Sequence, residues 1–481
     1  MKTGLLWFRS DLRLADNPAL ARALAECERI VPVYILEPRP ESAWPLGSAS
    51  RWWLHHSLLA LDGSLRERGS RLIIRSGPVL PVLETLLTET GGSAVYWNRR
   101  YEPSAIASDT AVKARLIEQG MTVGSCNAAL LAEPWEIGRD GGKPYRVFTP
   151  YWKALVAKGW EQRQADMPER LPPLPGELHS LAVADLGLLP KISWDAGLTE
   201  AWTPGETGAQ AELEIFVAEA LHDYAVGRDL PAIRGTSRLS PHLHFGEIGP
   251  RQIAHALAMH AAEAGGAGVD GYLRELGWRE FAHHILYHFP HTADAPFDPR
   301  FETFDWNKAP PPGVLRAWQR GQTGIPLVDA GMRELWRTGW MHNRVRMVVA
   351  SFLTKNLRIH WLEGARWFWD TLVDADLANN AMGWQWCAGC GTDATPYFRI
   401  FNPVTQGERF DPDGVYVRRW VPELATLPNR YIHQPWTAPA AVLQGCRLRL
   451  GSDYPMPIAD LKASRAEALA AYRDWQAAPS S

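Results

Sequence analysis

Residues 4–36 read GLLWFRSDLRLADNPALARALAECERIVPVYIL, two short apolar runs with a helical pattern between them. The runs at 4–8 and 30–36 have the length of buried strands, and the pattern over 18–27 predicts a helix. Asn17 precedes Pro18, and this order is typical of an N-cap followed by the first helical residue. The stretch therefore predicts a strand–helix–strand unit of a parallel sheet.

The same alternation continues to about residue 130. It predicts further strands and helices, the strands at 71–75, 94–97 and 121–125 and the helices at 50–68, 79–90 and 104–119. Strands that alternate with helices build a parallel sheet with helices on both faces. We therefore predict an α/β domain over residues 1–130, with a doubly wound, Rossmann-like sheet.

The pattern changes twice after residue 130. Residues 131–208 are predicted to be a connector, because 160–208 is rich in proline and has little periodicity. From 209 to 481 the periodicity is helical, at 210–224, 249–263, 270–288, 326–338, 342–357 and 458–475. The predicted fold class is thus α/β plus an all-α domain.

The composition excludes several classes of protein. Hydrophobic residues make up 46% of the chain, which excludes general disorder. No apolar run approaches the roughly 18 residues of a membrane span, and the charged N-terminus does not resemble a secretory signal. Five cysteines are too few for a disulfide scaffold. We therefore expect a cytoplasmic protein.

Charge and tryptophan content bear on the partners. The net charge of −3 gives no overall attraction to nucleic acid or membrane. Residues 316–366 nevertheless carry far more Lys and Arg than Asp and Glu, with tryptophans between them. Basic residues bind phosphates and aromatic rings stack on bases, so this segment suggests nucleic acid. The alternative is a solvated helical face above buried tryptophans.

Residues 235–241 read GTSRLSP and offer a candidate phosphate site. A glycine, three hydroxyls and an arginine can surround a pyrophosphate with donors. The α/β region itself lacks the G-x-G-x-x-G and P-loop motifs. The alternative for 235–241 is a solvated turn that caps a helix.

Asp374 and Asp376 form a second candidate site. Two carboxylates one residue apart can hold a metal with a sugar nucleotide, or accept hydrogen bonds from a ring N–H and a ribose. An exposed acidic turn is the alternative. Asn380 and the run Trp384-Gln385-Trp386 follow closely, which favours a functional role.

Two further patterns suggest metal or redox sites. His284 and His288 have the spacing of a zinc pair on one helix face, but no H-E-x-x-H motif or obvious third ligand accompanies them. Cys387 and Cys390 form a C-x-x-C without a second close pair. We therefore predict that no metal binds here and that the histidines of this segment, His283, His284, His288 and His291, lie at the surface or in a groove. We also predict that Cys387 and Cys390 are a pair of small buried residues.

Together the longer motifs resemble the photolyase/cryptochrome family, from residue 7 to residue 403. The most specific are Trp7–Arg13 (WFRSDLR), 235–241, 276–281 (LGWREF), 339–347 (GWMHNRVRM), 384–386 (WQW) and 397–403 (YFRIFNP). The resemblance implies an α/β antenna domain, the connector, and a helical domain at 209–481 that binds FAD and DNA.

The resemblance also implies roles for individual residues. The expected FAD contacts are Tyr224, Thr236, Ser237, Arg238, Leu239, Ser240, Tyr272, Arg279, Asp374, Asp376 and Asn380. The expected pocket for a flipped lesion consists of Glu275, Trp278, Asn343, Met347 and Trp386, and the expected DNA contacts are Arg228, Arg344 and Gln406. The expected electron-transfer chain is Trp384, Trp361 and Trp306.

The choice of branch follows from a few positions. Members that repair (6-4) lesions carry His where this chain has Asn343 and Met347, so the pair resembles enzymes for cyclobutane pyrimidine dimers. Asn380 and the absence of a long polar tail also resemble bacterial repair enzymes. We expect light-driven repair of UV-damaged DNA by electron transfer from reduced FAD, in a monomer with no membrane or obligate protein partner.

Two alternatives remain. A cryptochrome would sense blue light with the same flavin domain and would not repair DNA. Setting the resemblance aside, a sugar-nucleotide transferase could use Asp374 and Asp376 with a metal.

A second chromophore is expected in the α/β domain. The carboxyl ends of its strands are the usual place for a ligand. The stretches 50–56 and 97–101 resemble a proteobacterial branch, similar to the plant cryptochromes, that holds methenyltetrahydrofolate there. Glu37 could accept two N–H bonds from a pterin, and Arg51 could stack on it or pair with a glutamate tail. A deazaflavin is the competing antenna, and a surface pair between Glu37 and Arg51 is the structural alternative.

Overall fold

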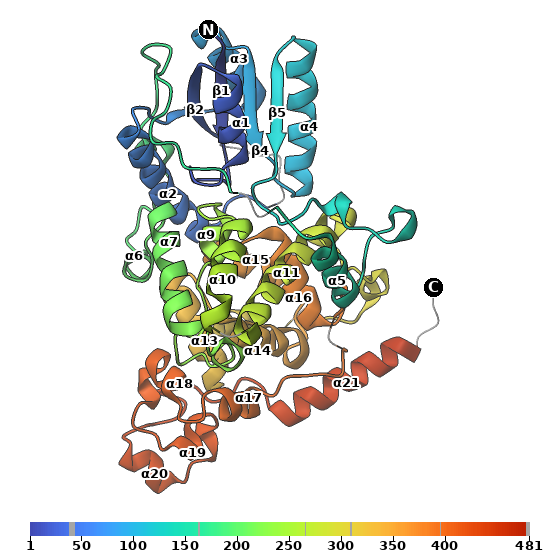
Figure 1. The fold of residues 1–481 in the computed structure, drawn as a ribbon. Helices are drawn as coiled ribbons and strands as arrows, with labels where there is room; N and C mark the ends of the chain where they lie inside the picture. The colour runs from blue at the N-terminus through green and yellow to red at the C-terminus, as the bar shows by residue number, and fades with distance from the viewer. Residues whose placement is uncertain (38–43, 162–163, 265, 308–309, 395, 478–481) are drawn as a thin grey trace. The chain divides into compact units, whose positions relative to one another are not determined.

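The computed structural model describes residues 1–37, 44–161, 164–264, 266–307, 310–394 and 396–477 (Figure 1). The chain forms two compact units, each built from separate stretches of sequence. Unit 1 holds residues 1–222, 237–290 and 373–378, and unit 2 holds 223–236, 291–372 and 379–481. The domain boundaries predicted at residues 130 and 208 divide the chain into consecutive segments, whereas each unit combines separate stretches. These boundaries stay a prediction.

A five-stranded parallel sheet lies in unit 1, as the sequence predicts. The strands are β1 (Thr3–Phe8), β2 (Arg29–Leu36), β3 (Ile73–Ser76), β4 (Ala94–Asn98) and β5 (Thr122–Cys126). The helices that connect them are α1 (Pro18–Glu26), α2 (Ser48–Glu67), α3 (Val79–Thr90) and α4 (Pro103–Glu118). The strand order is β3-β2-β1-β4-β5, so the winding direction reverses between β1 and β4.

Local signals explain why these elements form where they do. The Asn17 side chain accepts a hydrogen bond from the Leu20 amide at 3.1 Å, and Pro18 opens α1. The apolar runs become the central strands, where Leu5, Val31 and Val95 are fully buried. Strands covered on both faces are typical of a parallel sheet.

The rest of unit 1 is mostly helical. Its longer elements are α5 (Phe148–Lys158), α6 (Ala196–Ala201), α7 (Glu206–Ile215), α9 (Ser240–His244), α10 (Pro250–Ala264) and α11 (Gly266–His288). Short 3₁₀ turns lie at Pro134–Glu136, Asp140–Gly142 and Val183–Leu186. The helix predicted over 210–224 is interrupted, because a π-helical turn at Phe216–Ala220 follows α7.

Unit 2 is helical among its described residues. Its helices are α8 (Tyr224–Gly227), α12 (Val314–Gln319), α13 (Pro326–Thr338), α14 (Asn343–Ser351), α15 (Trp361–Thr371), most of α16 (Leu377–Ala388), α17 (Pro403–Phe410), α18 (Val415–Trp420), α19 (Asn429–Ile432), α20 (Ala440–Gly445) and α21 (Leu461–Ala477). Shorter turns lie at Pro290–Ala293, Pro299–Thr303, Phe352–Asn356, Pro422–Leu424 and Pro435–Thr437. None of the helices described has the length and apolar character needed to cross a membrane.

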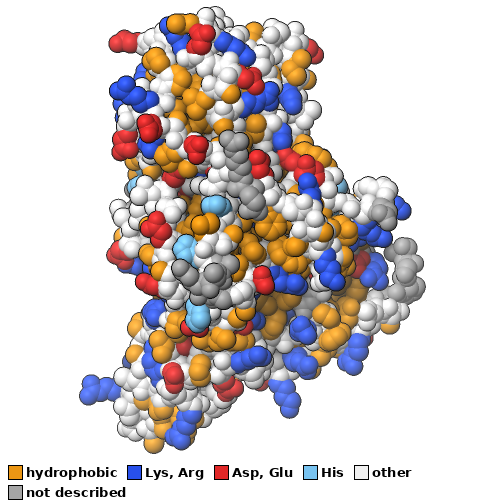
Figure 2. Space-filling model, viewed as in Figure 1, with side chains coloured by type: hydrophobic (Ala, Val, Ile, Leu, Met, Phe, Trp, Pro, Cys, Tyr) orange, Lys and Arg blue, Asp and Glu red, His pale blue; other side chains and the backbone are white. Residues whose placement is uncertain are grey.

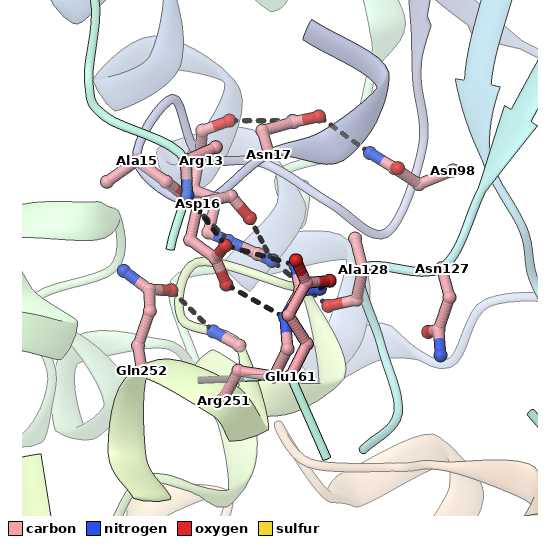
Figure 3. Close-up of polar contacts among 12 residues, drawn as sticks. Arg13, Ala15, Asp16, Asn17, Asn98, Asn127, Ala128, Glu161, Arg251 and Gln252 are labelled. Atoms are coloured by element: carbon pink, nitrogen blue, oxygen red, sulfur yellow. Dashed lines mark hydrogen bonds and ion pairs between the residues drawn. The ribbon is translucent and has the colours of Figure 1, made fainter. Parts of the chain in front are cut away.

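A buried arginine holds the loop that follows β1 (Figure 3). Arg13 is 1% exposed and donates to four backbone carbonyls, those of Ala15 (3.0 Å), Asp16 (2.9 Å), Ala128 (3.0 Å) and Gly246 (2.9 Å). These carbonyl oxygens accept hydrogen bonds from the guanidinium N–H groups, which have no access to water in this buried position. Because Gly246 lies just after α9, the contact ties the segment that carries the 235–241 motif to the sheet.

The same loop is fixed by an ion pair. Asp16 has a left-handed backbone with φ of 45°, and its carboxylate lies 3.0 Å from the guanidinium of Arg251. Arg251, on α10, also lies 3.6 Å from Glu161 (Figure 3). The loop after β1 and the start of α10 are therefore held together within unit 1.

Candidate functional site

The phosphate motif begins at a close approach of two backbone segments in unit 2. A Cβ built on Gly235 would lie 2.2 Å from the carbonyl oxygen of Gly227. No other residue type fits that position without moving the backbone, since every other residue carries a Cβ. The glycine of the motif thus serves chain packing next to α8, the helix that begins with Tyr224.

The following residues of the motif are held inside unit 1. The hydroxyls of Ser237 and Tyr272 lie 2.7 Å apart, and the Leu239 amide donates to Ser237 Oγ at 3.2 Å. Arg238 has a left-handed backbone with φ of 55°, and its guanidinium lies 4.3 Å from the ring centroid of Trp202. Ser237 and Leu239 are buried, so the motif is not the solvated turn given as the alternative.

Asp376 lies in a cluster of buried charged groups. Its Oδ2 is 3.4 Å from His283 Nε2 and 4.0 Å from His244 Nδ1. Burial alone would raise the pKa of Asp376, but His283, His244 and Arg279 outweigh burial and hold it well below its usual range. Asp374 is also buried, so the exposed acidic turn is wrong. Among the described residues no group of three or more His, Cys, Asp and Glu side chains could hold a metal ion.

Arg279 and Glu280 join this cluster from α11. Arg279 donates to the Ala129 carbonyl at 2.7 Å, and the Glu280 carboxyl accepts from the Leu131 amide at 2.8 Å. Glu280 is 1% exposed, and burial raises its pKa to about 7. The predicted FAD contact Arg279 is thus engaged with the backbone of residue 129.

Glu280→Gln should make folding less dependent on pH. The folded pKa of Glu280 lies above the unfolded value, so the stability from its protonated form is present at low pH and lost as pH rises through about 7. From pH 5 to pH 8 the free energy of unfolding of the parent should therefore fall by up to about 3 kcal/mol more than that of the variant. Urea unfolding at both pH values tests this, with exposed Glu169→Gln as the control. Equal pH dependence of both variants would contradict it.

Two predicted lesion residues, Glu275 and Trp278, lie one turn apart on α11. The Trp278 ring stacks on Phe148 with ring centroids 3.7 Å apart and an interplanar angle of 9°. Arg274 lies 4.9 Å from the same Phe148 ring. Trp278 is half-buried, so one ring face is fixed by α5 while part of the ring stays accessible. No pattern in the sequence indicated a role for Phe148.

The other lesion residues lie on α14 and α16 in unit 2. Asn343 is exposed at the first position of α14, and the side chain of His342 caps that helix by accepting from the Arg344 amide at 3.2 Å. Met347 and Trp386 are half-buried. The Cys387 thiol lies 3.9 Å from the Met347 carbonyl oxygen, so the structure brings these two helices together.

Of the predicted DNA contacts, Arg344 pairs with an acid and Arg228 lies 5.4 Å from the ring centroid of Tyr224. Arg344 pairs with Asp229, the neighbour of Arg228, and lies 4.5 Å from the Phe410 ring centroid. Gln406 is half-buried on α17. Figure 2 shows further Lys and Arg side chains projecting from the segment that holds α18, α19 and α20.

The three predicted electron-transfer tryptophans are buried in unit 2. A Cβ built on Gly364 would lie 2.1 Å from the Trp384 ring, so this glycine lets Trp384 pack against α15 one turn from Trp361. The ring of His360 lies close to those of Trp361 and Trp306, with ring centroids 5.7 Å and 5.2 Å away, respectively.

Other tryptophans lie near this chain. Trp318 is 6.1 Å from Trp384, and Trp336 and Trp367 form a stacked pair at 6.1 Å and 7°. Trp340 instead packs edge-on against His342. Trp318, Trp336 and Trp367 are therefore further aromatic side chains in unit 2 that could carry an electron.

Gln385 is a positioning residue that sequence reasoning did not single out. Its amide donates to the carbonyls of Thr292 (2.8 Å) and Ala295 (3.1 Å) and accepts from the Phe297 amide (2.8 Å). The available signal in the sequence was a polar residue between two tryptophans, Trp384 and Trp386. These bonds fix the turn of α16 that carries both tryptophans.

Lys355 is fully buried beside the C-x-x-C. Its ammonium donates to the Ala388 carbonyl at 2.7 Å, at the end of α16, and lies 3.3 Å from the Tyr397 ring centroid. Burial lowers the pKa of Lys355 to about 7 and raises the pKa values of Cys387 and Cys390 to about 12. Both cysteines are free and buried, as predicted.

Lys355→Met should remove a rise of stability with pH. The folded pKa lies below the unfolded one, so the parent gains stability as pH rises from about 7 toward about 10, at most about 1.4 kcal/mol per pH unit. The variant should lack this slope. Denaturant unfolding at pH 7 and pH 9 measures it, with exposed Lys462→Met as the control. Parallel slopes in parent and variant would show that Lys355 is not the group responsible.

The prediction of surface or groove histidines is wrong for His283 and His284. Both are buried, because α11 runs through the interior of unit 1. His284 uses its two ring nitrogens on the backbone, with Nε2 accepting from the Tyr145 amide at 3.1 Å and Nδ1 lying 3.2 Å from the Pro134 carbonyl oxygen. His288 Nε2 lies 3.1 Å from the same carbonyl oxygen.

Comparison with known proteins decides the family. A family model described as DNA photolyase matches residues 4–173, and one described as the FAD binding domain of DNA photolyase matches residues 272–474. A deoxyribodipyrimidine photo-lyase of Agrobacterium fabrum is 48% identical over 469 residues, which cover 97% of each chain. The chain belongs to the photolyase/cryptochrome family.

Solved structures and further relatives agree with this family. The crystal structure of a bacterial class III photolyase from Agrobacterium tumefaciens has a TM-score of 0.95 and 46% identity, covering 99% of this chain and 98% of that one. Cryptochrome-1 of Arabidopsis thaliana is 40% identical over 96% of this chain and 69% of its own length. The predicted fold class, a parallel α/β sheet followed by helices, is confirmed.

Proposed function

We propose that this protein is a light-driven deoxyribodipyrimidine photo-lyase that repairs cyclobutane pyrimidine dimers in DNA. The observation that carries the proposal is the full-length similarity to a photolyase of that name, 48% identical with 97% coverage. Asn343 and Met347, which resemble the dimer-repairing branch, lie accessible on the first turns of α14 and support the same substrate.

The lesion residues support stacking on a flipped dimer. A dimer pairs and stacks poorly, so its extrusion costs less than that of normal bases. Trp278 is held flat against Phe148 and can stack on a base with its accessible part. The family resemblance assigns Met347 and Trp386 to the same lesion, and Met347 supplies a polarizable thioether. Glu275, one turn before Trp278, would accept or share a proton at the pyrimidine edge.

The proposed FAD contacts have suitable chemistry. Reduced FAD, when bound and excited, supplies the electron that splits the dimer. Asn380 donates its amide N–H to the Ala365 carbonyl at 3.0 Å, which leaves its oxygen to accept an N–H from a flavin. Asp376 is held ionised and can accept from a ring N–H or ribose hydroxyl. The buried Ser237–Tyr272 pair offers hydroxyls beside the phosphate motif.

The antenna proposal concerns α2. Glu37 directly follows β2, and Arg51, in the first turn of α2, donates to the Gly187 carbonyl at 2.6 Å. Trp52 Nε1 and His55 Nδ1, in the same turns, are buried without a hydrogen-bond partner among the described residues. These features support methenyltetrahydrofolate near α2.

The chain itself fills the crevice between β1 and β4. Arg9 and Trp97 are buried there, and both bond to Asp109. The chain's own side chains thus occupy the place where the winding reverses. Denaturing the protein and separating the released chromophores tests the proposal, and recovery of a deazaflavin would overturn it. Release of folate by Glu37→Ala would support the role of that carboxylate.

A blue-light sensor is the second candidate, because cryptochrome-1 of Arabidopsis thaliana is 40% identical over nearly the whole chain. The test is a DNA oligonucleotide that contains one cyclobutane dimer, incubated with the protein under blue light or in the dark. Light-dependent loss of the dimer supports repair. Flavin photochemistry without loss of the dimer would overturn repair and support sensing. A (6-4) oligonucleotide should remain unchanged, and size-exclusion chromatography tests the proposed monomer.

A further inference from the structure

His283 is an imidazole whose two ring nitrogens both face oxygen atoms. Its Nδ1 lies 3.0 Å from the Arg279 carbonyl oxygen, one turn earlier on α11. Its Nε2 lies 3.4 Å from Asp376 Oδ2. A carbonyl oxygen and a carboxylate are both acceptors, and a neutral imidazole carries a hydrogen on one nitrogen only. When Asp376 is ionised, both contacts are therefore hydrogen bonds only if His283 is protonated on both nitrogens.

The other charged groups around the pair do not replace this contact. His244, from α9, lies farther away, 4.0 Å from Asp376 Oδ2, and burial lowers its pKa. Arg279 directs a guanidinium N–H to the Ala129 carbonyl and lies 3.5 Å from Glu280. The Tyr101 ring meets His283 edge-on at 6.4 Å.

Two further acids, Asp374 and Glu102, also interact electrostatically with this group. Both raise the pKa of His244. His283 is thus nearer to Asp376 than His244 is, at 3.4 Å against 4.0 Å.

We propose that His283 is a positioning residue whose positive charge keeps Asp376 ionised as an acceptor for the flavin nucleotide. The inference rests on the proposed function, because it takes Asp376 to be a contact of FAD. Burial opposes a charge on His283, but the attraction of Asp376 exceeds that effect and raises the pKa of His283. A buried carboxylate with no such cation would take up a proton nearer neutral pH.

The experiment measures how fast FAD leaves the purified holoprotein. The probe is the rise of free-flavin fluorescence after dilution, at pH 6, 7, 8 and 9. The variants are His283→Gln, which removes the charge, and His283→Arg, which keeps a cation that does not titrate. His288→Gln is the matched control, since it makes the same change on the same helix away from Asp376.

The wild-type protein and His283→Arg should release FAD at rates that are flat from pH 6 to pH 8. His283→Gln should release it at least roughly tenfold faster at pH 6, because removing one partner of a buried charge pair leaves the other charge unpaired. Its rate should slow toward pH 8, as Asp376 ionises. Identical rates and pH profiles for His283→Gln and His288→Gln would overturn the inference.

Two further outcomes separate this inference from the proposed function. A wild-type protein that binds no FAD would overturn the proposed function itself. If circular dichroism shows that His283→Gln is unfolded, His283→Asn removes the same charge and is measured in its place. Its release should be faster than that of the wild-type protein at pH 6 and should slow toward pH 8, and equal rates and pH profiles would overturn the inference.

Discussion

Trp384→Phe should abolish the photoreduction of oxidised FAD and leave repair intact when FAD is reduced chemically beforehand. Phenylalanine is far harder to oxidise than tryptophan, so the first electron donor of the proposed chain is lost. We expect photoreduction to slow at least about 100-fold, which corresponds to roughly 2.7 kcal/mol of barrier. Flavin absorbance under blue light, with an external reductant present, measures the rate.

The control makes the same change outside the proposed chain. Trp475, on α21, packs against Phe301 and donates to Thr303 Oγ1 at 3.2 Å. Trp475→Phe should photoreduce at the parental rate. Normal photoreduction in Trp384→Phe would instead point to another donor, for which the stacked Trp336 and Trp367 offer a route.

Trp278→Ala should weaken the binding of dimer-containing DNA by roughly 1–3 kcal/mol, the range for one base–aromatic stack. The loss is expected because the ring is already fixed against Phe148 and pays little entropy to stack on a base. Affinity for undamaged DNA of the same sequence should change little, since phosphate contacts dominate it. Fluorescence anisotropy with both oligonucleotides measures the difference.

Trp135→Ala is the matched control for Trp278→Ala. Trp135 lies in the same unit and is 49% exposed, so its loss changes the surface without touching α11's proposed lesion residues. Equal affinity of Trp278→Ala and the parent for dimer DNA would show that Trp278 is not part of the lesion pocket.

Local sequence signals predicted the sheet and its helices closely. The strand predicted at 30–36 is Arg29–Leu36, and the helix predicted at 79–90 is Val79–Thr90. These succeed because a buried strand reads as an apolar run, and because capping residues act over a few positions. The helix predicted over 342–357 was less accurate. Its last turn, Phe352–Asn356, is π-helical, and periodicity does not distinguish that turn from an α-helix.

Contacts between distant residues could not be predicted in this way. Arg13 donates to Gly246, and Phe148 stacks on Trp278, although no short-range pattern links the members of either pair. The guanidinium of Arg238, a predicted phosphate contact, also lies over the Trp202 ring, and no local pattern indicated that neighbour. Each outcome depends on which surfaces meet after folding.

The alternating sheet, the helical remainder and the family can be predicted from the amino-acid sequence, because strand and helix periodicities and long motifs lie in consecutive residues. The electrostatics of the site depend instead on contacts that form after folding. His283 and Asp376 are far apart in the chain, and each would keep an ordinary pKa in water. At 3.4 Å from each other, the pKa of His283 is raised and that of Asp376 is lowered, because a low-dielectric interior strengthens their attraction and removes the water that would screen it.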